Sequence, residues 1–300
     1  ILQRRTLHME KGFKETMLYK TTVTRKPPKD SLTTVYLLPS YAEVCINEGR
    51  SKSVIRNYRK IGDGKVINIV TGEIKEVSMQ KKARSLNRSF QRLRRLINNN
   101  FFGKSNEIHI TLTLKDEFKD LPLKELNNNY KKFWKCFVYR YPDSKYVVIR
   151  EISPRGRMHF HVLIRNDKCE VFNVEKLFIE EKWPWGFIHI NHISNNDNIG
   201  AYFTVFDDLL PELVEKQKNG EVNLKRSYIK KFPKGEHLYD KSRALKYPEP
   251  HVMTWEEAEK TFKGSELSFS KTLEIATVDE DGVIIPLNFI HYREYSRRRK

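Results

Sequence analysis

The chain has 300 residues, enough to bury one large hydrophobic core or two modest ones. Its formal net charge is +18, its pI is about 9.6 and aromatic residues make up 12 %. These values favour a polyanionic partner over an acidic small molecule and make nucleic acid the first candidate, with a merely solvated cationic surface, ribosomal binding and membrane-surface binding as alternatives.

Cysteine usage and hydropathy indicate a compartment. Cys45, Cys136 and Cys169 are dispersed, odd in number and form no CxxC pair, which is typical of free thiols in a reducing compartment. The most apolar window, residues 283–290, is too short and too interrupted to cross a bilayer. The N-terminus lacks the apolar region of a signal peptide. We therefore expect a cytoplasmic protein with no membrane partner.

The N-terminal part, residues 1–79, has a mixed composition and is interpreted as an accessory region. Within it, Thr71–Glu73 predicts a turn between two strand-like runs. Residue 1 is isoleucine, so we expect a translated fragment or a read-through product with Met9 or Met17 as alternative starts.

Residues 80–99 predict an amphipathic basic helix. Apolar residues recur at spacings of three and four, at Leu86, Phe90, Leu93 and Ile97. The basic residues of this stretch are Lys81, Lys82, Arg84, Arg88, Arg92, Arg94 and Arg95. This pattern fits a solvated face over a core stripe, a contact surface for DNA phosphates, or both.

Alternating patterns after this helix predict an α+β domain. The expected order is strand 106–114, helix 124–139, strand 145–151, a strand through 158–164, helix 174–182, strand 186–193 and helix 199–217. An antiparallel sheet with helices packed on one side is the economical assembly of these elements. We place a catalytic domain at residues 80–250, followed by a C-terminal accessory region with a basic tail at 251–300.

The most informative motif is His159-Phe160-His161. Side chains alternate across a strand, so both imidazoles point to one face. The preceding strand ends at Glu151, which could complete an N/N/O ligand set for a divalent ion. The alternatives are two packed, hydrogen-bonded histidines, and a Glu151 that pairs with a nearby arginine such as Arg150, Arg155 or Arg157.

The order of several motifs resembles that of HUH endonucleases, and most of all the rolling-circle replication initiators of plasmids and prophages from Gram-positive bacteria. The motifs are the Thr-Leu-Thr strand of 110–114, His159-Phe160-His161, the turn of 185–188 and a helix that contains Tyr202. The resemblance is firmest over residues 80–248. It includes a segment at 239–248 to which we assign no role.

The resemblance implies an α+β HUH domain and a nicking and rejoining activity on single-stranded origin DNA. Mg or Mn would be held by His159, His161 and Glu151. Tyr202 would attack phosphorus and leave a 5′-phosphotyrosine and a free 3′-OH. The 3′-OH would be extended by a host polymerase. No ATPase motif is indicated, so a host helicase would unwind the duplex. A conjugative relaxase or single-strand transposase would share this chemistry, and a non-catalytic nucleic-acid-binding protein is a further alternative.

The nucleophile has competing interpretations. Tyr202 could pack in the core beside Phe203, and the lysine that many such enzymes carry one turn later is replaced by Val205. Tyr228 is followed by Lys231 in a YxxK pattern and is the rival nucleophile, although it lies in a basic stretch farther from the histidines.

Other motifs are interpreted more narrowly. We expect His109, His189 and His192 to be structural, and Thr111 or Thr113 to approach the metal site only if the strand register permits it. Gly103-Lys-Ser105 lacks the earlier glycine of a phosphate loop. Thr254 and Glu257 predict a helix-capping box, residues 267–290 predict a strand pair, and the tail 297–300 is a phosphate-contact candidate or a solubilising segment.

Overall fold

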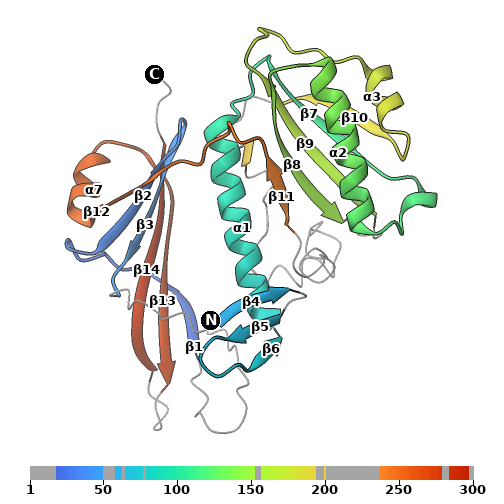
Figure 1. The fold of residues 1–300 in the computed structure, drawn as a ribbon. Helices are drawn as coiled ribbons and strands as arrows, with labels where there is room; N and C mark the ends of the chain where they lie inside the picture. Colours follow the sequence, from blue (N-terminus) through green and yellow to red (C-terminus); the bar gives the residue numbers. More distant parts are fainter. Residues whose placement is uncertain are drawn as a thin grey trace, which may run out of the picture. The chain divides into compact units, whose positions relative to one another are not determined.

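The computed structural model describes residues 18–49, 58–62, 65–76, 79–152, 157–193, 199–200, 237–278 and 284–296. The chain forms two compact units, one made of residues 1–55 and 248–300, the other of residues 56–247 (Figure 1). Each unit is described by itself. Among the described residues no helix is both long and apolar enough to span a bilayer.

The first unit is built on a six-stranded antiparallel sheet with the strand order β1-β13-β14-β3-β2-β12. The strands are β1 (Leu18–Val23), β2 (Leu32–Leu37), β3 (Tyr41–Asn47), β12 (Pro250–Thr254), β13 (Leu267–Val278) and β14 (Ile284–Ser296). The helix α7 (Trp255–Thr261) begins with the predicted capping box, because Thr254 and Glu257 bind each other's backbone N–H groups. The predicted strand pair is confirmed as β13 and β14.

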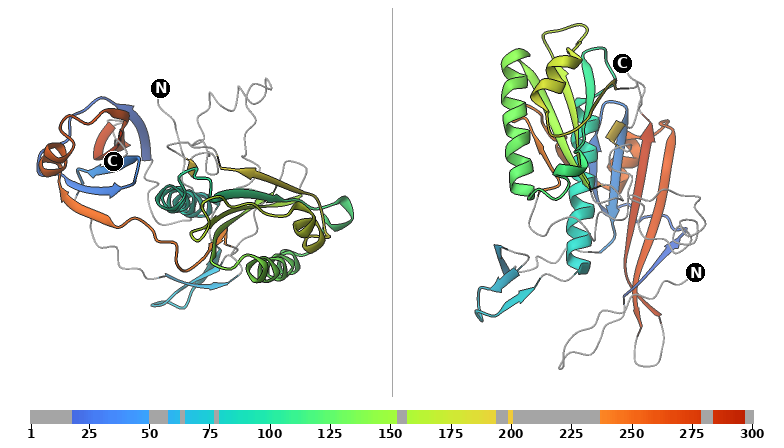
Figure 2. Two further views of the ribbon diagram at one scale, coloured as in Figure 1. Left: turned by 90° about the horizontal axis from the view of Figure 1, so that it is seen from above. Right: turned by 90° about the vertical axis from the view of Figure 1, so that its right-hand side faces the viewer.

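The two ends of the chain therefore share one sheet (Figure 2). Strand β1 pairs with β13, and β3 pairs with β14, across more than 200 residues of sequence. The boundaries of the compact units fall near residues 55 and 247, whereas the predicted boundaries lie at 79 and 250 and keep the two ends in separate regions. Pairing between such distant strands leaves no local pattern in the sequence.

The second unit contains a five-stranded antiparallel sheet with the order β10-β7-β9-β8-β11. Its strands are β7 (Glu107–Leu112), β8 (Ser144–Ile152), β9 (Met158–Asn166), β10 (Ile188–His192) and β11 (Tyr239–Lys241). A separate three-stranded sheet is formed by β4 (Tyr58–Gly62), β5 (Lys65–Asn68) and β6 (Ile74–Glu76), with the predicted turn at Thr71–Glu73 between β5 and β6. The predicted α+β class is confirmed.

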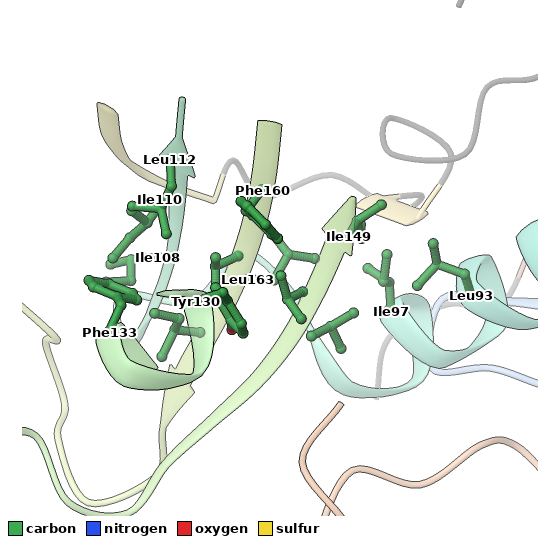
Figure 3. Packing of buried hydrophobic residues seen from close by; sticks show 14 of the residues in the cluster. Leu93, Ile97, Ile108, Ile110, Leu112, Tyr130, Phe133, Ile149, Phe160 and Leu163 are labelled. Carbon is green, nitrogen blue, oxygen red and sulfur yellow. The ribbon is translucent and has the colours of Figure 1, made fainter. Parts of the chain in front are cut away.

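Helices cover parts of both faces of the five-stranded sheet. Helix α2 (Leu123–Arg140) packs Tyr130 and Phe133 against Phe160 and the side chains of β7, whereas Leu93 and Ile97 of α1 (Met79–Asn100) lie beside Ile149 (Figure 3). Phe160 pairs with Arg150, the residue after Ile149, so Phe160 and Ile149 point to opposite faces. The expected packing on one side thus describes α2, and α1 lies on the other face.

Aromatic packing holds α2 to its face of the sheet. The Tyr130 and Phe160 rings stack with centroids 5.3 Å apart, and Phe133 meets Trp183 edge to face at 5.9 Å. Trp183 follows helix α3 (Lys176–Lys182) and, like Phe133 and Phe160, is almost fully buried. Burial of each such side chain contributes about 1.5–3 kcal/mol, so these contacts fix α2 on the sheet.

The described stripe of α1 matches the prediction. Phe90, Leu93 and Ile97 are buried, while Arg88 and Arg92 are exposed. The side chains of residues 79–84 and 86–87 lie outside the described part of the chain. The three cysteines are free thiols, as expected.

Gly186 permits the turn between α3 and β10. A Cβ built on Gly186 would lie 1.6 Å from the carbonyl oxygen of Thr113, at the end of β7. At the same point Thr113 N–H donates to Phe187 O at 2.9 Å, and Trp183 Nε1–H donates to Thr113 O at 2.9 Å. The backbones can approach this closely only because residue 186 has no side chain.

We expect Gly186→Ala to lower the free energy of unfolding of the second unit by about 3 kcal/mol, the upper end of overpacking costs. Gly72→Ala is the control, since Gly72 has a φ of 73° with no atom within 4 Å of an added Cβ. Its backbone strain alone should cost about 1 kcal/mol. Denaturant unfolding compares the two variants, and equal losses would contradict the close approach at Gly186.

Candidate functional site

The histidine motif lies on β9, in the centre of the five-stranded sheet. On one side Glu151 of β8 pairs with His159 and Ile149 pairs with His161, and on the other side Thr111 of β7 pairs with His161. Directly paired residues of antiparallel strands point to the same face. The carboxylate and the two imidazoles therefore share the face on which α1 packs.

Glu151 and His161 are in direct contact. The His161 Nε2 atom lies 2.7 Å from Glu151 Oε2, and only 17 % and 15 % of the two side chains are exposed. The rings of His159 and His161 are 6.4 Å apart between centroids. Burial lowers the pKa of His159, and the positive charges of His161 and Arg157 lower it further, against the opposing effect of Glu151. His159 is therefore a neutral imidazole at pH 7.

The arginines considered as partners for Glu151 bind other carboxylates. Arg150 projects to the opposite face, where it donates to Asn127 Oδ1 at 2.7 Å and to Asp240 Oδ2 at 2.5 Å. Arg157 donates to Asp116 Oδ1 at 2.5 Å. Arg155 lies outside the described residues. The carboxylate of Glu151 thus has a histidine partner on its own face.

His109, expected to be only structural, joins the site. Its Nε2 atom lies 3.1 Å from His161 Nδ1, and the two rings stack with centroids 5.3 Å apart. The Thr111 hydroxyl is 3.3 Å from His109 Nε2 and 3.5 Å from His161 Nδ1. The register thus brings Thr111, but not Thr113, to the histidines, since the Thr113 hydroxyl donates to Phe187 O. The two-residue spacing of His109 and Thr111 could have indicated their shared face.

The two remaining histidines of this sheet lie on the edge strand β10. His189 pairs with Thr111 and shares the face of His161, and His192 pairs with Ile108 on the face of α2. Both side chains are exposed. Neither is drawn into the contacts that join Glu151, His161 and His109.

The donor types suit a divalent ion, but the described side chains are closed upon one another. No group of three or more His, Cys, Asp and Glu side chains in the described part of the chain has the arrangement of a metal site. Two ligand atoms about 2.1 Å from one ion at tetrahedral or octahedral angles are ~3.0–3.4 Å apart. Glu151 Oε2 and His161 Nε2 are 2.7 Å apart and share a hydrogen bond. Small side-chain movements, with loss of this hydrogen bond, would admit an ion beside His159.

The loop before β7 uses its backbone to bind a carboxylate of the same chain. Glu107 Oε2 accepts the N–H groups of Phe102 and Gly103 at 2.7 Å each, and that of Lys104 at 3.3 Å. Gly103 has a φ of 72°, which turns these N–H groups inward. The N–H groups that a phosphate loop would offer to a nucleotide are therefore occupied by Glu107.

The cationic charge is concentrated in the second unit. Residues 56–247 contain 38 Lys and Arg and 23 Asp and Glu, a net charge of +15 out of +18. On the outer side of α1, Arg88 and Arg92 are exposed, and the guanidinium of Arg92 lies 5.0 Å from the Tyr247 ring centroid. Exposed arginines beside an aromatic ring suit a nucleic-acid backbone.

The 239–248 segment closes one edge of the sheet. Strand β11 pairs with β8 so that Tyr239 lies opposite Ile149, and the Tyr239 and Tyr247 hydroxyls are 2.8 Å apart. Burial, followed by the hydrogen bond with Tyr247, raises the pKa of Tyr239. The carbonyl of Lys246 accepts from Asn100 Nδ2 at 2.8 Å, which ties the segment to the end of α1. The segment thus joins α1 to the sheet.

Both proposed nucleophiles, Tyr202 and Tyr228, lie outside the described residues, as does the tail 297–300. The chain just before Tyr202 is described and helical at Ile199 and Gly200. Gly200 N–H donates to Asn98 Oδ1 of α1 at 2.6 Å, and a Cβ on Gly200 would lie 2.6 Å from Arg94 O. The polypeptide therefore reaches α1, on the histidine face, two residues before Tyr202.

Comparison with known families finds a match within this unit. The model of a family described as replication-associated protein ORF2 matches residues 107–206. The matched segment starts at β7, contains Glu151, His159 and His161, and ends four residues after Tyr202. It covers 100 of the 300 residues, and the chain is similar to this family over that segment. No curated protein matches the chain.

The buried carboxylate of Glu107 should make stability depend on pH. Burial raises the pKa of Glu107, against the opposing effect of its backbone hydrogen bonds and of Arg165. The folded state then binds the proton more tightly than the unfolded state, whose glutamate pKa is about 4.3. The stability contributed by the protonated form is complete below that pH and is lost as pH rises through the folded pKa.

We expect the free energy of unfolding of the wild type to fall relative to that of Glu107→Gln as pH rises from 4 to 7. The glutamine keeps an acceptor for the loop and carries no titrating charge. Denaturant unfolding at several pH values measures the difference. A wild type that gains stability over the variant across this range would contradict the raised pKa.

Proposed function

We propose that this chain initiates rolling-circle DNA replication by nicking and rejoining single-stranded origin DNA. The observation that carries the proposal is the common sheet face of His159, His161 and Glu151, within the segment that matches replication-associated proteins. The net charge of the second unit supports a DNA substrate.

In this proposal His159, His161 and Glu151 would hold Mg or Mn. The bound ion would polarise the scissile phosphate and stabilise the charge that develops during attack. The neutral state of His159 supports ligation, because a ligating imidazole needs a free lone pair. The carboxylate of Glu151 supplies the oxygen donor that Mg and Mn favour.

Tyr202 is the proposed nucleophile. Its hydroxyl oxygen would bond to phosphorus, the bond from phosphorus to the 3′ oxygen would break, and that oxygen would take up a proton. The products are a 5′-phosphotyrosine on the protein and a free 3′-OH, and the phosphotyrosine conserves the bond for rejoining. The approach of Gly200 to α1 supports this choice, because it brings the chain to the histidine face shortly before Tyr202. Tyr228 remains the rival.

Single-stranded DNA would run along the exposed side of α1. Arg88 and Arg92 are spaced by one helical turn and would contact successive phosphates. A conjugative relaxase or single-strand transposase would use the same site, and the DNA substrate distinguishes these functions. The direct hydrogen bond between Glu151 and His161 favours one second candidate, a DNA-binding protein that performs no cleavage.

Covalent capture of DNA tests the chemistry. Purified protein is incubated with labelled single-stranded DNA tiled across its gene neighbourhood, with Mn, with Mg or with chelator, and adducts are resolved on denaturing gels. We expect a metal-dependent adduct that is lost in Tyr202→Phe and retained in Tyr228→Phe. Tyr139→Phe is the matched control, since Tyr139 is 92 % exposed on α2.

Loss of the adduct in Tyr228→Phe alone would move the nucleophile to Tyr228. Tight binding without an adduct on any tile would support the DNA-binding protein that does not cleave. An adduct that persists in chelator would rule out the proposed metal dependence.

The salt dependence of binding tests the DNA path. Each phosphate contact contributes about 0.7 to the slope of log K against log salt concentration for single strands, so Arg88→Ala with Arg92→Ala should reduce the slope by about 1.4. Lys131→Ala with Lys132→Ala is the control, because both lysines are exposed on α2, across the sheet. Fluorescence anisotropy at several salt concentrations measures the slopes. Equal reductions in both double variants would argue against a path along α1.

A further inference from the structure

We propose that His109 is a positioning residue that sets the tautomer and orientation of His161 for metal binding. This inference rests on the proposed metal site. The Nδ1 atom of His161 faces His109 Nε2 at 3.1 Å, while its Nε2 atom faces Glu151 Oε2 at 2.7 Å. Both ring nitrogens of His161 therefore have partners on the same face of the sheet.

The proton positions of the two rings must be coordinated. Glu151 accepts a hydrogen bond when it is ionised, so His161 carries its proton on Nε2 while it contacts Glu151. His161 Nδ1 is then an acceptor for the Nε2–H of His109 or for the Thr111 hydroxyl. In this state His161 cannot offer Nε2 to an ion.

Metal binding through Nε2 requires the other tautomer of His161. The proton must then reside on Nδ1, which needs an acceptor, and a ligating histidine commonly donates its second N–H to such a group. His109 Nε2 is that acceptor if His109 carries its own proton on Nδ1. An imidazole can serve both states because it donates in one tautomer and accepts in the other.

The sheet register places His109 for this role. His109 lies opposite Leu163, one step along the face from the pair formed by Thr111 and His161. The rings stack with an interplanar angle of 28°, and Thr111 contacts both ring nitrogens. Helix α1 covers this side of the sheet near Ile149, and His161 is largely shielded from water. A shielded imidazole N–H must be hydrogen bonded to avoid a desolvation cost.

The test measures Mn²⁺ affinity of the full chain without DNA, by electron paramagnetic resonance of free Mn²⁺. His109→Ala should weaken binding about 10-fold or more, as removal of such a partner commonly does. His109→Gln should restore the affinity to within a few-fold, because the amide oxygen can accept from His161 Nδ1. His192→Ala is the control and should bind like the wild type, since His192 is exposed on the other face of the sheet. Circular dichroism checks that each variant folds.

A second measurement uses the wild type alone. In ¹⁵N-labelled protein, the imidazole nitrogen shifts should show the proton of His161 moving from Nε2 to Nδ1 as Mg²⁺ is added, and that of His109 from Nε2 to Nδ1 in parallel. This readout does not depend on the folding of any variant.

The outcomes separate the two proposals. Wild-type affinity in His109→Ala, or a His109 tautomer that ignores Mg²⁺, would overturn the role of His109 and leave the metal site intact. Loss of binding in His109→Gln as complete as in His161→Ala would make His109 a ligand and also overturn the positioning role. A wild type that binds no Mn²⁺ would overturn the metal site, and the role of His109 with it.

Discussion

The hydrogen-bonded register of β7, β9 and β8 is the constraint on which the rest of the site depends. Three strands from different parts of the chain each contribute every second residue to the same face. A shift of one residue in β9 would turn both histidines toward α2 and bring Phe160 to the opposite face. The aromatic packing of Phe160 against Tyr130 opposes that shift. The hydrophobic core on one face therefore fixes the polar site on the other.

The electrostatics of the second unit follow from the same division of faces. Arg150 and Asp240 form their ion pair on the α2 side, adjacent in sequence to residues that face the histidines. On the histidine side, Glu151 keeps a partner that can change its protonation site, and His109 extends this polar row across the sheet. The first unit carries a net charge of only +3 and holds its own buried histidine, His291, between Glu48 and Thr272. The properties expected of a DNA-processing surface thus lie in the second unit.

Closure of the second unit depends on segments that come late in the chain. Strand β11 completes the edge of the sheet beside β8, and the carbonyl of Lys246 binds the end of α1. Gly200 reaches the same helix from the other direction along the chain. Helix α1 is therefore held by the sheet, by the segment before Tyr202 and by the segment after residue 237. This arrangement connects the basic helix to the histidine face, which the proposed function requires.

The sequence by itself determined the local elements and the grouping of His159 with His161. Helical spacing of apolar residues and period-two alternation are local patterns, so α1, α2, the strands and the capping box at Thr254 could be predicted from neighbouring residues. Tyr202 and Tyr228 remain predictions. Only the tertiary structure decided that β7 lies beside β9, which brings His109 to His161, and that the two ends of the chain share one sheet. Such contacts depend on pairing between distant strands, and the stabilising interactions of that pairing arise only after the chain has folded.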